Sequence, residues 1–303
     1  MFQACCQKWI RCKYRLSLYK FLEMISSIVV CGAGTMGSGI AQVAAQAGFT
    51  TILYDVDGSR LKAAAASIQK SLAGLVTRGK ITDAEKNDID KRLVYAGRPE
   101  DCRADLVIEA IIENKDAKVA LFNLLAGVNP AETIFVTNTS SLPVTAIAES
   151  VFKPGRVAGL HFFNPAPIMK LVEIIVTPFT EPNVIAELKA VATRMGKTSV
   201  ICKDAPGFIV NRVARHYYLE TMWMVEKGLV SIEQADAALE SAGFRMGPFK
   251  LMDLIGIDIN YTVSEMVWKA LGEPPRLKPS SMQHEKLRAG LLGRKSGRGF
   301  YQY

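Results

Sequence analysis

A histidine and a glutamate in two neighbouring apolar segments are the side chains best suited to acid–base chemistry. His161 follows the apolar run 157–160, and Glu173 lies inside the run 170–176. An imidazole titrates near physiological pH, so His161 can accept a hydroxyl proton while hydride leaves the same carbon. A carboxylate on the second ring nitrogen would stabilise the imidazolium, and Glu173 otherwise has little reason to be there. By residue type alone, a structural loop histidine would be the better interpretation.

The polar neighbours of this pair favour the catalytic interpretation. Segment 137–141 places hydroxyls and an amide at the end of the preceding predicted strand, although ordinary turn and cap groups would look the same. Asn211 lies just inside the first helix after the Pro206–Gly207 linker, where a cleft between domains would form. The other two histidines are expected to be structural (His216) and solvated (His284).

A glycine-rich turn predicts a dinucleotide site. A G-x-G-x-x-G sequence follows the β-branched run 25–30 and opens a helical segment, which is the context that this fingerprint requires. Asp55 ends the second predicted strand, where its carboxylate can bind both ribose hydroxyls and would repel a 2′-phosphate. This favours NAD over NADP, although Arg60 could moderate the preference and Asp55 could instead cap a nucleotide-free turn. The fingerprint residues are Gly32, Ala33, Gly34, Thr35, Met36 and Gly37.

Alternating apolar runs and helical stretches predict an α/β fold for the first 200 residues. Such alternation is what a mostly parallel sheet requires. Between 58 and 92, two long alanine- and charge-rich helices flank Arg78–Gly79–Lys80, as either a ligand-binding helical hairpin or mere decoration. The predicted strands cover 25–30, 50–54, 106–110, 134–137, 157–160, 170–176 and 198–202.

The β-rich pattern ends at 204–207, and residues 208–292 are typical of helices punctuated by glycine. The predicted fold is therefore an α/β unit, with a mostly parallel sheet and an inserted helical hairpin, followed by a smaller all-α domain. One stripe in the second domain is expected in its core or at a subunit interface: Tyr217, Tyr218, Met222, Trp223 and Met224.

Composition narrows the possible functions. With 49% hydrophobic and 22% charged residues, the chain of 303 is typical of a soluble globular protein with two domains. Residues 1–23 carry five cations and one acid, so five minus one, or +4, of the net +8 lies there. The remaining +4 is too small to predict nucleic-acid binding but would suit a small polyanionic substrate. No stretch approaches the roughly 18 apolar residues of a membrane span.

The cysteines and the first 23 residues indicate in which cellular compartment the protein is expected. Six cysteines without a C-x-x-C pair predict neither a disulfide framework nor a metal site, but reduced thiols in the cytoplasm. Cys31 is expected in the core. Segment 1–23 is basic and acid-poor, as in a targeting peptide or a surface helix. Because Met24 directly precedes the first strand, a disordered tail or an upstream misread start is the better interpretation.

Several blocks, in order from 27 to 303, resemble the L-3-hydroxyacyl-CoA dehydrogenase family, specifically its bacterial stand-alone 3-hydroxybutyryl-CoA type. They are GAGTMGSGIAQ, LVIEAIIEN, TNTSSLPVT, GLHFFNPAPIMKLVEII, KDAPGFIVNR, GPFKLMDLIGID and LGRKSGRGFYQY. The resemblance implies a Rossmann-type NAD domain over 24–205, whose hairpin 58–92 is a lid over coenzyme A, and a helical domain over 206–303 that forms a homodimer. It implies NAD-dependent, reversible oxidation of a short (3S)-3-hydroxyacyl-CoA.

The resemblance also implies roles for particular residues. The catalytic set is Ser140, His161, Glu173 and Asn211. Besides the fingerprint and Asp55, the NAD contacts are Glu113, Lys118, Asn138, Ser140, Asn164 and Lys295. The substrate contacts are Ser71, Arg78, Lys80, Ser140 and Asn211, where Arg78 stands at the family's lysine position.

Two alternative functions stay open at the level of sequence. One is a substrate with a longer acyl chain or 3-hydroxyadipyl-CoA, as in aromatic-acid degradation, because segments 214–223 and 274–299 look more like that branch. A second carboxylate would need a cation in the pocket. The fold has also been recruited as a lens structural protein, against which the retention of His161 and Glu173 argues. Related dehydrogenases with a lysine base are disfavoured, because no lysine stands in an equivalent motif.

Overall fold

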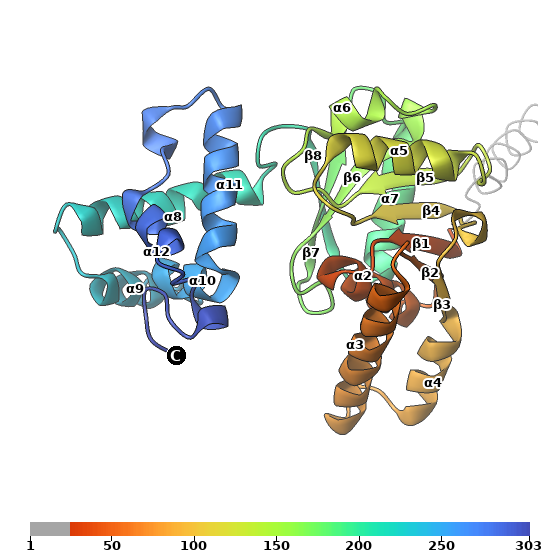
Figure 1. Ribbon diagram of the computed structural model, residues 1–303, viewed down its shortest axis with the longest axis horizontal. Coiled ribbons are helices and arrows are strands. Elements are labelled where there is room, and N and C mark those ends of the chain that lie inside the picture. Colours follow the sequence, from red (N-terminus) through yellow and green to blue (C-terminus); the bar gives the residue numbers. More distant parts are fainter. Residues whose placement is uncertain (1–24) are drawn as a thin grey trace, which may run out of the picture. The chain divides into compact units, whose positions relative to one another are not determined.

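The computed structural model describes residues 25–303, so the expectations for segment 1–23 lie outside the described residues (Figure 1). The chain forms two compact units. The sheet unit comprises residues 25–139 and 144–201, and the helical unit comprises 140–143 and 202–303.

An eight-stranded sheet with the order β3-β2-β1-β4-β5-β6-β7-β8 forms the centre of the sheet unit. Strands β1 to β6 pair in parallel, and β7 pairs antiparallel with β6, which confirms the mostly parallel sheet. The central strands are buried β-branched runs, as a sheet covered on both faces requires. The strands are β1 Ser27–Cys31, β2 Thr50–Tyr54, β3 Leu93–Ala96, β4 Leu106–Glu109, β5 Ile134–Thr137, β6 Val157–Phe162, β7 Leu171–Val176 and β8 Thr198–Lys203.

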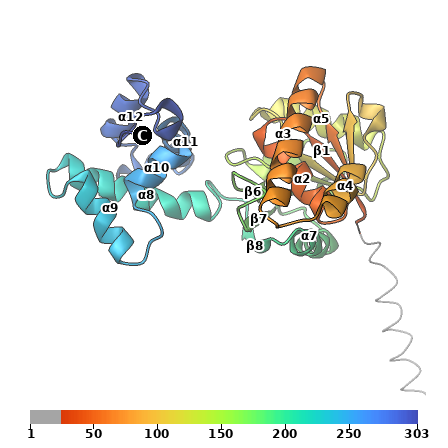
Figure 2. The same cartoon turned by 90° about the horizontal axis from the view of Figure 1, so that it is seen from below.

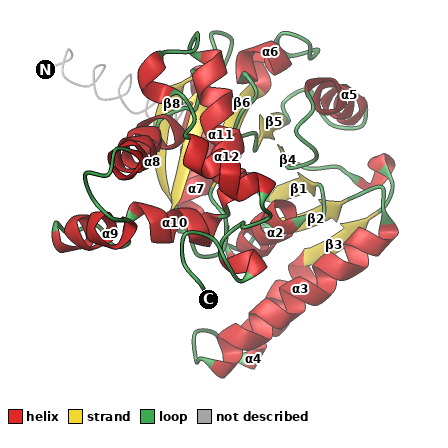
Figure 3. Cartoon of the chain, turned by 60° about the vertical axis from the view of Figure 1, so that its left-hand side comes forward, coloured by secondary structure: helices red, strands yellow, loops and turns green. Residues whose placement is uncertain are grey.

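Helices cover both faces of this sheet. Figure 3 shows α5 and α6 on one side and α2 on the other, and α7 packs against β7 (Figure 2). Cys31 is buried in β1, as expected. The helices are α2 Thr35–Gln46, α3 Gly58–Thr77, α4 Asp83–Arg92, α5 Lys115–Ala126, α6 Val144–Ala148 and α7 Pro182–Arg194.

Helices α3 and α4 form the predicted hairpin, which extends away from the sheet (Figure 1). Asp57 caps α3 by accepting hydrogen bonds from the backbone of Ser59 and Arg60. Thr82 and Glu85 form a capping box at the start of α4. Strand β3, which directly follows α4, was not predicted, because its sequence LVYA is too short to show an alternating pattern.

Five helices build the second unit: α8 Val210–Glu226, α9 Ile232–Ser241, α10 Pro248–Ile255, α11 Ile257–Ala270 and α12 Ser281–Arg288. Tyr218 and Met222 of the predicted stripe lie in its core with Phe249, whereas Trp223 is 49% exposed. His216 is exposed, so the expectation of a structural histidine there was wrong, because it lies on the outer face of α8. In residues 25–303, no helix is long and apolar enough to cross a membrane.

Candidate active site

His161 and Glu173 face each other across the antiparallel pair β6–β7. The register places the two residues opposite one another, and Nδ1 of His161 lies 2.7 Å from Oε2 of Glu173. Both side chains are buried. His161 lies inside β6 rather than just past it, because pairing with β7 extends the strand to Phe162. The antiparallel turn back to β7 thus gives the histidine a fixed, water-shielded carboxylate partner.

The glycine-rich turn has the geometry that a dinucleotide phosphate needs. A Cβ added at Gly37 would lie 1.7 Å from the carbonyl oxygen of Gly32, and Gly32 has a φ of +100°, so both positions need glycine. Gly34 precedes α2 without a side-chain cap, and the first turn of α2 has no acid. A Cβ at Gly34 would meet nothing within 4 Å. The residues therefore fit a pyrophosphate at this helix N-terminus.

Asp55 follows β2 and holds the glycine-rich turn in place. Its Oδ2 accepts a hydrogen bond from the backbone N–H of Ala33 (2.8 Å), and its Oδ1 accepts one from the N–H of Asp57 (2.9 Å). Each carboxylate oxygen has two lone pairs, so Asp55 can bind the turn and a ribose hydroxyl at once. The predicted position is thus compatible with NAD, and the carboxylate also has a structural role that the sequence did not show.

A buried charge network lies at the ends of β4 and β5. Lys118, 1% exposed, has its Nζ 2.6 Å from Oε1 of Glu109 and 3.1 Å from Oε2 of Glu113. Glu109 also accepts from the hydroxyl of Thr137 (2.6 Å), and Glu113 accepts from that of Thr139. Sequence reasoning named Lys118 and Glu113 but missed Glu109. Its signal was the one that identified Glu173, an acid in an apolar strand.

Two other predicted NAD residues lie close to these strand ends. Asn138 follows β5, and its Oδ1 accepts a hydrogen bond from the N–H of Phe162 (2.8 Å), so it ties the ends of β5 and β6 together. Ser140 is half-buried and belongs by its contacts to the helical unit.

A cavity of about 320 Å³ lies within the sheet unit, between the glycine-rich turn, α3 and segment 164–167. It brings together five predicted positions: Ala33, Gly34 and Thr35 of the fingerprint, Ser71 and Asn164. Arg78 and Lys80 are exposed at the tip of the hairpin and do not line this cavity. The structure thus separates the predicted serine contact from the two cationic ones by about two turns of α3 or more.

In the helical unit, Asn211 lies in the first turn of α8, and its carbonyl oxygen accepts a hydrogen bond from Nε of Arg215 (3.0 Å). Lys295 lies in the short 3₁₀ turn Arg294–Ser296, with its Nζ 2.6 Å from the carboxylate of Asp258. Arg215 is a buried cation that sequence reasoning missed. It shares the buried face of α8 with Tyr218, Leu219 and Met222, so the available signal was a cation at helical spacing from apolar residues.

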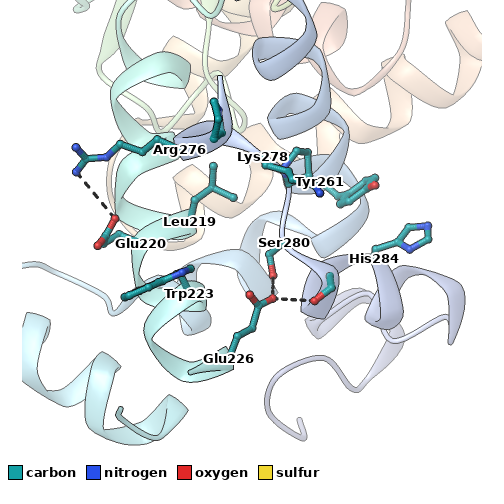
Figure 4. A pocket seen from close by; sticks show the side chains of 12 residues that line it. Leu219, Glu220, Trp223, Glu226, Tyr261, Arg276, Lys278, Ser280 and His284 are labelled. Carbon is teal, nitrogen blue, oxygen red and sulfur yellow. Dashed lines mark hydrogen bonds and ion pairs between the residues drawn. The ribbon is translucent and has the colours of Figure 1, made fainter. Parts of the chain in front are cut away.

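A larger cavity, about 720 Å³, lies within the helical unit, and Figure 4 shows its lining. Trp223 and Tyr261 contribute aromatic surface, Ser280 donates to Glu226 (2.6 Å), and Arg276 approaches Glu220 at 4.0 Å. No predicted catalytic or NAD residue lines this cavity. Its size therefore does not identify the reaction site; the buried pair on β6 and β7 is the better guide.

Two family models together match nearly all of the described residues. Residues 27–205 match the NAD-binding domain of 3-hydroxyacyl-CoA dehydrogenase, and residues 207–303 match the C-terminal domain of the same enzyme. The chain belongs to the 3-hydroxyacyl-CoA dehydrogenase family. This confirms the family, the NAD cofactor and the NAD-dependent dehydrogenase class expected from the sequence.

Named relatives in this family agree on the reaction and differ in the acyl chain. A 3-hydroxyadipyl-CoA dehydrogenase of Escherichia coli is 46% identical over 281 residues, 92% of this chain and 59% of the relative. A probable 3-hydroxybutyryl-CoA dehydrogenase of Bacillus subtilis is 41% identical, covering 92% and 98%. The crystal structure of (S)-3-hydroxybutyryl-CoA dehydrogenase from Ralstonia eutropha superposes with a TM-score of 0.88 at 34% identity, covering 92% and 99%.

Proposed function

We propose that His161 is the general base that removes the 3-hydroxyl proton of the substrate. The observation that supports this most directly is the buried 2.7 Å contact between its Nδ1 and Glu173. This contact assigns Nδ1 to the carboxylate, so the proton of the substrate goes to Nε2. Glu173 keeps the ring in the required tautomer and stabilises the imidazolium as it forms. In the reverse direction the same imidazolium returns the proton to the alkoxide.

NAD, when bound, accepts the hydride that leaves the same carbon. The chain's own residues hold it: the amides of the glycine-rich turn contact the phosphates, and Asp55 contacts the adenine ribose. Lys118 keeps Glu113 in position through their 3.1 Å ion pair. The remaining proposed NAD contacts are Asn138, Ser140, Asn164 and Lys295.

Ser140 and Asn211 are the proposed contacts to the reacting end of the substrate, where their hydroxyl and amide groups stabilise developing charge on oxygen. Coenzyme A lies along the hairpin, with Ser71 at the small cavity and Arg78 and Lys80 at the hairpin tip. The tip cations are exposed and suit phosphate groups of the carrier. The proposed reference substrate is the four-carbon thioester, 3-hydroxybutyryl-CoA.

The second candidate substrate is 3-hydroxyadipyl-CoA, a six-carbon thioester with a second carboxylate. The E. coli relative of that name is 46% identical, against 41% for the B. subtilis relative named for the butyryl substrate. The two candidates share the base, the cofactor and the carrier, so they differ only in the surroundings of the acyl tail.

The purified chain tests this function directly. With acetoacetyl-CoA, it should consume NADH, followed by the loss of absorbance, and it should use NADPH at least tenfold less efficiently because Asp55 repels the 2′-phosphate. A chain that reduces no 3-oxoacyl-CoA with either cofactor would contradict the proposal.

We also propose a domain boundary at residues 205 and 206 and a homodimer through the helical unit. Several large apolar side chains of this unit are exposed, which favours a partner surface. They include Val213, Trp223, Leu229 and Phe244. Light scattering coupled to gel filtration should give about twice the 33.2 kDa chain mass, and a monomer at micromolar concentration would exclude the dimer.

A further inference from the structure

Arg215 is a buried cation without an anionic partner. It stands on α8 one helical turn after Asn211, and it is only 3% exposed. Its Nη1 donates to the carbonyl oxygen of Asn260 (2.9 Å) and to Oγ of Ser264 (2.7 Å), both on α11. These acceptors are neutral. Among residues 25–303, no carboxylate lies within ion-pair distance of the guanidinium.

The guanidinium is nevertheless charged at neutral pH. Burial lowers the pKa of Arg215 to about 10, which still lies well above physiological pH. A buried charge without a counter-ion is unfavourable, and proteins normally pair such a group or give it a ligand.

The buried acids of the same unit show how a charge can be satisfied by neutral groups alone. Each carboxylate oxygen of Asp236 accepts a backbone N–H, from Phe249 (2.9 Å) and Lys250 (3.0 Å). Asp253 is held in the same way by the N–H groups of Phe300 and Tyr301. Both acids therefore use all their oxygens, and they need no ligand.

Arg215 differs because donors around it exceed acceptors. Its second terminal nitrogen, Nη2, has no hydrogen bond to any described residue. The amide nitrogen Nδ2 of the neighbouring Asn260 is shielded from solvent and also has no acceptor. The one acceptor nearby without a donor is Oε1 of Gln283, whose Nε2 donates to Asn260. The unpaired Nη2 of the guanidinium suits a small anionic oxygen ligand.

We propose that Arg215 receives a second carboxylate at the far end of the acyl chain, which favours the second candidate, a 3-hydroxydicarboxyl-CoA thioester, over the four-carbon reference substrate. This rests on the proposed function, in which Asn211 contacts the reacting end. Residues four apart share a helix face and lie one turn of about 5.4 Å along it. In a six-carbon chain, three carbon–carbon bonds separate the hydroxyl carbon from the carboxylate carbon, roughly 4 Å when extended. The carboxylate oxygens lie about 1.2 Å beyond that carbon, so they reach about one helical turn from Asn211.

Substrate competition tests this inference on the unmodified chain. The values of kcat/KM with NAD are measured for 3-hydroxybutyryl-, 3-hydroxyhexanoyl- and 3-hydroxyadipyl-CoA. The last two have the same chain length and differ in the terminal carboxylate, so we expect at least about a tenfold preference for the adipyl thioester. If the hexanoyl thioester is used equally well or better, while turnover occurs, the role of Arg215 is overturned and the proposed function stands. If no thioester is oxidised, both are overturned.

Variants of Arg215 test whether this residue is the cause. Arg215→Met should lower kcat/KM for the adipyl thioester about 30- to 100-fold and change that for the hexanoyl thioester less than threefold. Arg215→Lys keeps the charge but not the planar donor group, so it should give an intermediate loss. Arg212→Met, at an exposed position of α8, is the matched control and should leave the ratio unchanged. Equal losses on both thioesters would make Arg215 merely structural. If Arg215→Met does not fold, the preference of the unmodified chain decides.

Discussion

Each unit of the chain buries one strong cation, and the two units satisfy it in opposite ways. In the sheet unit, Lys118 lies 2.6 Å from Glu109 and 3.1 Å from Glu113. In the helical unit, Arg215 has only neutral partners. The first charge is balanced within the fold and positions the residues around it. The second is left for something outside the fold, which is why we assign it to the substrate.

The pair His161 and Glu173 resembles Lys118 and its carboxylates, because both partners lie within the fold. Its carboxylate and ring are matched across two strands whose register is set by backbone hydrogen bonds. A matched group of this kind keeps its geometry without a ligand, as a base must before substrate arrives. Lys118 and the pair His161–Glu173 thus have their charged partners already in the fold. Arg215 receives an anionic partner only when the proposed substrate binds.

The largest expected effect follows from removing Lys118, the cation that is paired with two carboxylates. Lys118→Met leaves Glu109, which is 0% exposed, without its cation and should lower the free energy of unfolding by about 3–5 kcal/mol. Arg215→Met leaves no carboxylate unpaired and should cost only about 1–2 kcal/mol, mainly for acceptors that lose a donor. Urea unfolding of the two variants measures this difference. Equal losses would mean that the two cations are satisfied alike.

Removing His161, the proposed base, should affect turnover rather than stability. His161→Gln keeps a polar side chain of similar size but cannot take up the proton, so kcat should fall by about a hundredfold or more. Affinity for NADH, followed by its fluorescence, should change little because the ring lies outside the glycine-rich turn. A variant with the activity of the unmodified chain would remove the general-base role.

A smaller effect is expected at Asp55, a charge that neutral donors hold in place. Asp55→Asn retains one acceptor oxygen but loses the charge and one of its two backbone hydrogen bonds, which come from Ala33 of the glycine-rich turn and from Asp57. The efficiency ratio of NAD to NADP should fall by about tenfold. Kinetics with both cofactors measure the ratio, with Asp57→Asn, at the exposed cap of α3, as the control. An unchanged ratio would mean that Asp55 only supports the turn.

The smallest effect concerns Asp105, an exposed carboxylate held by neutral donors. Partial burial acts to raise its pKa, but hydrogen bonds from Ser26 and Ser27 hold the pKa below its usual value. A lowered pKa in the folded state means that the stabilisation is present above about pH 4 and is lost as the pH falls through the folded pKa. Asp105→Asn should therefore cost less than about 1 kcal/mol at pH 7 and nothing at pH 2. Urea unfolding at both pH values measures this, and a loss that persists at pH 2 would exclude the charge as its cause.

Much of the site was predictable because its signals are local. A strand followed by G-x-G-x-x-G requires neighbours within a few residues, and the structure has α2 begin at Thr35 directly after the turn. An acid inside an apolar strand predicts burial with a partner, and this applies to Glu173. The same reasoning applied to Glu109 would have found the partner of Lys118. Strand β3 and the position of His161 inside β6 were missed, because both depend on pairing with a distant strand.

The sequence by itself determined most of the order of elements, the dinucleotide turn, the family and the two residues, His161 and Glu173, that we propose as the base and its acid. Each of these depends on residue type and short spacing. Only the tertiary structure decided which partner each buried charge has. Lys118 and Arg215 look alike as cations on amphipathic helices. The first meets two carboxylates because β4 ends beneath α5, and the second meets only neutral groups because α11 presents Asn260 and Ser264 to α8. That difference is a property of packing. It makes Arg215 a candidate determinant of the specificity for the acyl tail of the substrate.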